Sequence, residues 1–401
     1  MGRVPVEPRM SMNPAPRSRR LSLLLVPVAL ACALLAPAAA SANKKLRVGF
    51  LDNAYALSNP DLFWSEAQDL NVGFMRWDLQ WKHVAPTKPR NPRDPGDPAY
   101  QWGETDRFVQ RAVAEGLAGN IMFTLWATPK WASTTPKAKG VTATMPKLDA
   151  WRNFTYAAAK RYSGTYTPAG ATQPLPRITA WEAWNEPNGY FALRPQFQNG
   201  EAVSPRNYTT LLNAMGKEIN KALPFKPTIV AGALYKTGGG NSVNPITFMR
   251  GMQAAGAKFD VLSVHPYNKV AAKGVRDGAS QSRTNPAYIA IGNLDAFVSL
   301  SNEIFGRKRP VWVTEFGWNT PAPGQTLTTV SFAQQARFAQ QSIAKMKQIP
   351  QVERLAWFLM RDDHPKPAGK WYTTGLIELD QVDKPSYDAW QGAARGLQGI
   401  G

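Results

Sequence analysis

Two glutamates stand near the carboxyl ends of apolar, β-rich runs of this 401-residue chain. Glu186 closes the run "ITAWEAWNE", and Glu315 lies in "RPVWVTEFGW". Burying an unpaired carboxylate is costly, so each needs a partner or a chemical task. Two carboxyl groups that face each other roughly 5 to 5.5 Å apart can cleave a glycosidic bond with retention, because one protonates the departing oxygen while the other attacks the anomeric carbon.

Repulsion between two such groups would separate their roles. At ~5 Å and an effective dielectric constant of ~20, two ionised carboxylates repel by about 3 kcal/mol, or roughly two pKa units. One of them therefore stays protonated near neutral pH. When the nucleophile becomes esterified its charge disappears, the pKa of its partner falls, and that partner can then activate water as a base.

Eight short β-rich runs recur along the chain, separated by loops and by segments with helical periodicity such as residues 104–117. The runs are 46–54, 72–81, 119–127, 178–186, 227–235, 259–267, 309–318 and 352–360. This alternation predicts an α/β fold in which parallel strands are joined by crossover helices. We expect a (β/α)8 TIM barrel, formed as a single domain by residues 43–401. Glu186 and Glu315 then meet at its C-terminal face, where long loops after the strands predict a walled cleft.

Glu182 shares a run with Glu186. At ~3.3 Å per residue it lies ~13 Å deeper along the strand, too deep to reach a sugar. We expect a buried carboxylate paired with Arg76 or with another inward polar group.

Three motifs together resemble clan A of the glycoside hydrolases. They are "WNEPN", "VTEFGW" and the intervening "HPY", and the likeness spans about residues 46–390. Family 39 is the most similar and family 5 is its competitor. The resemblance implies a retaining hydrolase with Glu186 as the acid/base and Glu315 as the nucleophile. It also implies that Asn185 binds the 2-hydroxyl of the sugar.

The remaining correspondences concern the surroundings of the nucleophile. The resemblance implies that Tyr267 holds the nucleophile, that Arg76 keeps it ionised, and that Trp357 floors the subsite where cleavage occurs. His265 lies on the strand face of Tyr267, and we expect it to contact the sugar or a neighbouring side chain. Asp78 stands where some family members carry a histidine, which puts a xylosidase-type specificity in doubt.

Tryptophan is abundant, with 14 residues. Flat amphipathic rings stack on sugar faces, so we expect Trp126 and Trp318 to line the cleft beside Trp357, although core packing is the usual role of any single ring. Four other polar residues follow predicted strands, and each is either a substrate contact or a solvated loop residue. They are Asp52, Asn53, Asp362 and Asp363.

The sequence predicts neither a metal site nor a cofactor. It has three histidines without an H-x-x-x-H pair, its single cysteine is Cys32, and the "TGGGN" segment lacks the features of a nucleotide-binding loop. The formal net charge is +19. This favours acidic surroundings such as cell-wall polymers, although a basic surface without a specific anion site is the simpler explanation. The basic residues are scattered and form no nucleic-acid motif, so we expect a carbohydrate substrate, no nucleic acid and a monomer.

Residues 1–42 have the pattern of an export signal. Arg17, Arg19 and Arg20 precede an apolar run, and Ala40-Ser41-Ala42 fits a signal-peptidase site. "SRRLSL" also resembles a twin-arginine signal. We therefore expect a secreted protein that is not inserted in a membrane after cleavage. The sequence favours a secreted retaining glycosidase, and the alternative is a barrel that binds glycans without hydrolysing them.

Overall fold

The computed structural model describes residues 43–366 and 371–400. The predicted export signal, residues 1–42, lies outside the described residues.

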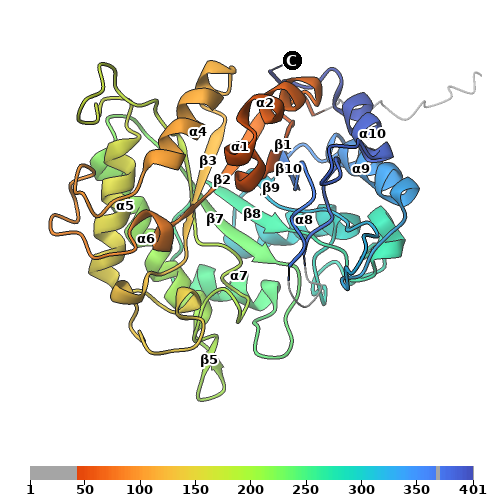
Figure 1. The fold of residues 1–401 in the computed structure, drawn as a ribbon. Coiled ribbons are helices and arrows are strands. Elements are labelled where there is room, and N and C mark those ends of the chain that lie inside the picture. Colours follow the sequence, from red (N-terminus) through yellow and green to blue (C-terminus); the bar gives the residue numbers. More distant parts are fainter. Residues whose placement is uncertain (1–42, 367–370, 401) are drawn as a thin grey trace, which may run out of the picture. The chain divides into compact units, whose positions relative to one another are not determined.

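Eight parallel strands close into a barrel, as predicted (Figure 1). They are β1 (Arg47–Leu51), β2 (Phe74–Gln80), β3 (Ile121–Trp126), β4 (Ala180–Ala183), β7 (Thr228–Tyr235), β8 (Val261–His265), β9 (Val311–Val313) and β10 (Val352–Phe358). Their order around the barrel is β1-β10-β9-β8-β7-β4-β3-β2, so chain neighbours pair and β10 closes onto β1. Each strand lies within one of the eight predicted runs, since a strand covered on both faces requires a nearly continuous apolar segment.

Helices surround the barrel and cover its outer face (Figure 1). They are α1 (Asn53–Ser58), α2 (Pro60–Asp69), α3 (Trp81–Val84), α4 (Gly103–Ala114), α5 (Leu148–Arg161), α6 (Ser204–Ala222), α7 (Pro245–Ala254), α8 (Leu294–Phe305), α9 (Phe332–Met346) and α10 (Pro385–Ala394). Short 3-10 turns cover Lys130–Ala132, Val141–Ala143, Ala271–Arg276 and Ile291–Asn293. Strands β5 (Phe197–Gln198) and β6 (Glu201–Ala202) form a small antiparallel hairpin in the loop after β4. No helix of the described residues is long and apolar enough to span a membrane.

The barrel interior is stacked in layers of inward-facing side chains. The lowest layer is apolar and consists of Phe74, Met122, Ala180, Val230, Val261, Trp312 and Ala356. Side chains alternate between the two faces of a strand, so the residues two positions further along also point inward. These residues include Arg76, Thr124, Glu182, Ser263 and Thr314, all of them fully buried. A polar layer thus separates the apolar floor from the mouth of the barrel.

Candidate active site

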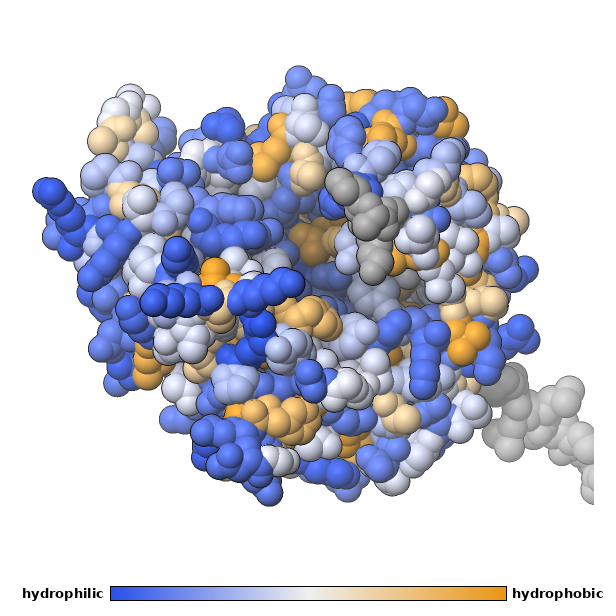
Figure 2. Space-filling model, turned by 60° about the horizontal axis from the view of Figure 1, so that its bottom comes forward, coloured by the Kyte–Doolittle hydropathy of each residue, from blue (hydrophilic) through white to orange (hydrophobic). Residues whose placement is uncertain are grey.

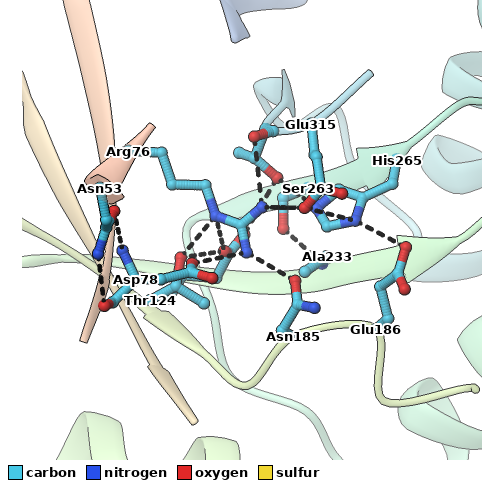
Figure 3. A network of polar contacts seen from close by, with 12 residues as sticks. Asn53, Arg76, Asp78, Thr124, Asn185, Glu186, Ala233, Ser263, His265 and Glu315 are labelled. Atoms are coloured by element: carbon cyan, nitrogen blue, oxygen red, sulfur yellow. Dashed lines mark hydrogen bonds and ion pairs between the residues drawn. The ribbon is translucent and has the colours of Figure 1, made fainter. Parts of the chain in front are cut away.

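Arg76, on β2, is the centre of a buried polar network (Figure 3). Its Nη1 donates to Glu315 Oε2 at 2.9 Å, and its Nη2 donates to Asn185 Oδ1 at 2.6 Å. Below them, Nε donates to Thr124 Oγ1 at 2.9 Å and lies 3.4 Å from Glu182 Oε2. The guanidinium is fully buried among these acidic groups, and its pKa is raised although burial alone would lower it. One cation therefore connects the deep carboxylate to the carboxylate at the mouth.

Glu182 has the structural surroundings expected of it. The side chain is fully buried, and Thr124 Oγ1 donates to its Oε2 at 2.6 Å. Burial raises the pKa of Glu182, while the charge of Arg76 opposes that shift. The predicted pairing with Arg76 is confirmed.

Glu315 lies two residues beyond the end of β9 and is held from two sides. Tyr267 Oη donates to its Oε1 at 2.7 Å, and Arg76 binds its Oε2. Burial raises the pKa of Glu315, whereas the Arg76 charge and the Tyr267 hydrogen bond both favour the ionised carboxylate. Both oxygens are fixed in orientation by donors from β2 and from the end of β8.

Glu186 follows β4 through a backbone that leaves the strand conformation early. The strand ends at Ala183, and both Trp184 and Glu186 have a left-handed backbone, with φ of 66° and 46°. Such values are uncommon for residues other than glycine, and they cluster at functional sites. The predicted strand end at Glu186 is therefore wrong by three residues, since the chain turns to direct this side chain over the mouth.

His265 connects Glu186 to the network. Its Nε2 lies 3.1 Å from Arg76 Nη1, which can only donate, so Nε2 must accept. The proton is then on Nδ1, which donates to Glu186 Oε1 at 3.0 Å. Burial, followed by the Arg76 charge, lowers the pKa of His265 well below its ordinary value, which keeps the ring neutral. Among the described residues, this is the side-chain hydrogen bond that orients Glu186.

The two glutamates lie close together. One oxygen of each and a ring nitrogen of His265 all fall within 4.8 Å of one another. Burial and the neighbouring charge of Glu315 raise the pKa of Glu186 well above its ordinary value. Glu186 is therefore the carboxyl group that stays protonated, and Glu315 is the one held by Arg76 and Tyr267. The same three donors could also approach a metal ion, but the buried Arg76 guanidinium within the cluster opposes a second cation there.

The remaining predicted site residues differ in their surroundings. Asn185 is half-buried, and its amide nitrogen makes no hydrogen bond within the described residues. Asp78 lies 3.2 Å from Arg76 Nη2, beside the half-buried ring of Trp126. Asn53 binds the backbone of Asp78 through both ends of its amide. Trp318 is 4% exposed but contributes to the cleft wall.

Trp357 does not floor the cleft, so this prediction is wrong. The ring is fully buried between the barrel and the helices, where it packs at 5.6 Å from Trp390, and its Nε1 donates to Thr374 O. Ala356 points into the barrel, so Trp357 points outward and Phe358 inward. Phe358 is the half-exposed aromatic residue of β10 that lines the cleft.

Two of the strand-end aspartates are structural. Asp52 is buried, caps α1 through Tyr55 N and accepts from Met360 N and Arg361 N, and burial raises its pKa to about 6. Asp362 pairs with the buried Lys384 at 2.7 Å. Both residues border the aspartate hollow, but they are buried and engaged with the protein, so neither is a solvated loop residue.

Two adjoining hollows form the cleft. Figure 2 shows a depression near the centre of the face in view, with hydrophilic side chains around much of its rim. The aspartate hollow is lined by Asn53, Asp78 and Phe358, among others. The lysine hollow is lined by Glu186, Glu315, Lys236, Lys269, Phe191 and Tyr267, among others. Tyr372 borders both hollows.

Sequence reasoning missed Phe358, Lys236, Phe191 and Tyr372. Lys236 directly follows β7, and Phe191 comes five residues after Glu186, so their positions near strand ends were a usable signal. Tyr372 lies 14 residues after Phe358, in a long loop where the sequence carries no such signal.

Comparisons with known proteins agree with this fold. Residues 183–375 match the family model of the glycosyl hydrolase catalytic core. A family 39 glycoside hydrolase from the gut symbiont Bacteroides cellulosilyticus WH2 superposes with a TM-score of 0.60 at 20% identity, covering 89% of this chain and 65% of that one. The chain has the fold of the clan A glycoside hydrolases.

Two further structures show the same architecture. A monomeric β-xylosidase from Caulobacter crescentus CB15 gives a TM-score of 0.54 at 16% identity and covers 87% of this chain and 67% of that one. A family 5, subfamily 18 enzyme from Streptomyces cattleya, in complex with Manβ1-4GlcNAc, gives 0.56 at 18% identity and covers 87% and 80%. Among curated proteins, none matches the sequence significantly. The predicted resemblance to families 39 and 5 is confirmed at the level of the fold.

Proposed function

We propose that the chain is a secreted retaining glycoside hydrolase that cleaves O-glycosidic bonds of an oligosaccharide or polysaccharide by double displacement. The observation that carries the proposal is the close pair of Glu186 and Glu315 in unlike surroundings. Glu186 donates the proton to the departing oxygen, and Glu315 attacks the anomeric carbon. A carboxyl separation of about 5 Å suits this route, because inverting enzymes need roughly 6.5 to 9.5 Å to admit a water molecule.

In the first step, the Glu315 carboxylate forms an ester with the sugar while the bond from the anomeric carbon to the leaving oxygen breaks. The Glu186 proton goes to that oxygen. Esterification removes the charge of Glu315, so the pKa of Glu186 falls and its carboxylate can accept a proton from water. That water attacks the anomeric carbon, the ester bond breaks, and Glu315 is restored as a carboxylate.

The neighbours have supporting roles in this proposal. Arg76 and Tyr267 keep Glu315 ionised and oriented for attack. Asn185 presents its amide nitrogen to the sugar 2-hydroxyl, and His265 fixes one oxygen of Glu186 so that the other meets the leaving group. Asp78 and Phe358 line the sugar-binding part of the cleft, and Trp126 lies beside Asp78. Export through the segment 1–42 belongs to the same proposal.

The stereochemistry of the first product tests this proposal. Hydrolysis of a panel of α- and β-aryl glycosides is followed by proton NMR from the first minutes, before the product mutarotates. We expect the first sugar released to keep the anomeric configuration of its substrate. An inverted first product would exclude the nucleophilic role of Glu315. Binding without turnover on every substrate would favour the glycan-binding barrel.

A further inference from the structure

Lys236 lies in the lysine hollow without an acidic partner. It directly follows β7, is half-buried, and donates from Nζ to the backbone oxygen of Asn268 at 2.6 Å. Within the described residues, no carboxylate oxygen lies within 4.0 Å of this ammonium. An ammonium group has three N–H donors, so this one has capacity for a ligand.

Glu186 and Asp277 both act on the charge of Lys236 from beyond ion-pair distance, and Asp277 is already engaged elsewhere. Asp277 is fully buried, and its Oδ2 accepts from the backbone nitrogens of Lys269 and Val270 at 2.6 and 2.9 Å. Its Oδ1 accepts from Tyr288 Oη at 2.8 Å. Both oxygens of Asp277 are thus occupied in holding the loop after β8. That loop carries Lys269, an exposed second cation on the wall of the same hollow.

An exposed aromatic ring completes the hollow. Phe191 is 57% exposed and contacts Tyr235 edge-on, with the ring centroids 5.1 Å apart. A Cβ atom on Gly189 would lie 2.7 Å from this ring, so glycine is needed for the ring to occupy its position. A flat ring beside two ammonium groups matches a sugar that offers an apolar face and a negative charge.

The position of Glu186 assigns a direction to the cleft. Both glutamates border the lysine hollow, but its ammonium group Lys236 acts on the charge of Glu186 and so lies on the Glu186 side. An acid/base residue protonates the leaving-group oxygen, so the sugar beyond it is the leaving group. We infer that the lysine hollow is a leaving-group subsite for an acidic sugar, whose carboxylate or sulfate binds Lys236 and Lys269 while its ring stacks on Phe191. The assignment of this hollow to the leaving group rests on the proposed function. The proposed contact with an anion rests on Lys236 and Lys269 alone.

Binding measured without hydrolysis tests this inference. Isothermal titration uses the full chain with Glu315→Gln and pairs of oligosaccharides that differ in charge. The pairs are oligogalacturonate and oligomannuronate, each with its methyl ester, and a carrageenan oligomer with its desulfated form. We expect at least one acidic member to bind about tenfold more tightly than its neutral counterpart, because a desolvated charge pair is added. Which pair shows the preference distinguishes a carboxylate from a sulfate ligand.

Substitutions then locate the charge effect. Lys236→Met should remove the preference for the acidic member and leave binding of the neutral one unchanged within about twofold, and Lys236→Arg should retain most of the preference. The matched control is Lys258→Met, which removes an exposed lysine before β8, at the opposite end of the barrel. It should change neither affinity by more than about twofold.

Three results would overturn the inference. They are the absence of any preference for an acidic member, an equal loss of affinity in the Lys236→Met and Lys258→Met variants, and an equal weakening of acidic and neutral ligands by Lys236→Met. The last result would show that Lys236 acts through Glu186 rather than on an anion. Hydrolysis of neutral aryl glycosides places no anion in the hollow, so failure of the proposed function would be recognised separately.

Discussion

Glu182 and Glu186 are four residues apart in the chain and have opposite surroundings. Glu182 is fully buried, accepts from Thr124 and faces Arg76, so its carboxyl group belongs to the interior of the barrel. Glu186 is 8% exposed, borders the cleft, and is held through one oxygen by His265. The same residue type is thus structural in one layer and available for chemistry in the next.

The difference shows how the barrel separates stability from reactivity. Glu182 neutralises part of the Arg76 charge and accepts from the Thr124 hydroxyl, and breaking a buried pair is strongly destabilising. Glu186, at the mouth, has surroundings that raise its affinity for a proton. Its backbone has an unfavourable conformation. Substitutions at the two positions should therefore have separate consequences.

The largest expected effect is that of Glu186→Gln on turnover. Removing the acid should lower kcat on glycosides with sugar leaving groups by about 10²- to 10⁴-fold, because that oxygen needs a proton. Dinitrophenyl glycosides need none, so their first step should be nearly unaffected. The basic limb of the pH–rate profile, which reflects deprotonation of Glu186 at its raised pKa, should also disappear. Steady-state kinetics on both substrate types measure this, and equal losses on both would argue against the acid role.

The next effect is that of Glu182→Ala on stability. The change leaves the Thr124 hydroxyl without its acceptor and Arg76 without its deepest ion-pair partner, so we expect the free energy of unfolding to fall by about 3 to 5 kcal/mol. Urea unfolding followed by tryptophan fluorescence measures this. Glu186→Ala is the matched control, for which we expect a loss of about 1 kcal/mol or less. Similar losses in both variants would show that the two layers are not energetically distinct.

The smallest effect concerns Tyr267→Phe. Its hydrogen bond stabilises the ionised form of Glu315, so its removal raises the pKa of that carboxyl group. Attack requires the ionised form, and activity is lost as the pH falls through this pKa. The acidic limb of the kcat/KM profile should therefore move to higher pH by about one unit. A limb that stays in place or moves to lower pH would contradict the assignment of Glu315.

The fold could be predicted from the sequence because each barrel strand is covered on both faces. Such strands are continuous apolar runs. Few folds other than a barrel can accommodate eight of them alternating with helical segments. The pairing of Glu182 followed from the same reasoning, since a charge at that depth needs a partner. The strand end at Glu186 did not follow, because the left-handed turn at Trp184 depends on tertiary contacts.

The face of each aromatic residue on β10 was the main failure. Trp357 and Phe358 are adjacent, so one must face the helices and the other the cleft, and the sequence alone does not say which. Ala356 in the apolar floor decides the matter, and it is identified only once the layers of the barrel are known. Lys236 was missed for a different reason, because a single lysine after a strand is ordinarily solvated.

Covalent trapping identifies the nucleophile directly. The protein is incubated with a panel of 2-deoxy-2-fluoro glycosides bearing dinitrophenyl leaving groups, which slow the second step more than the first, and is then analysed by intact mass and peptide mapping. We expect one sugar to become attached and the labelled residue to be Glu315, with no label in the Glu315→Gln variant. A label on Glu186, or turnover of these aryl glycosides that persists in Glu315→Gln, would contradict it.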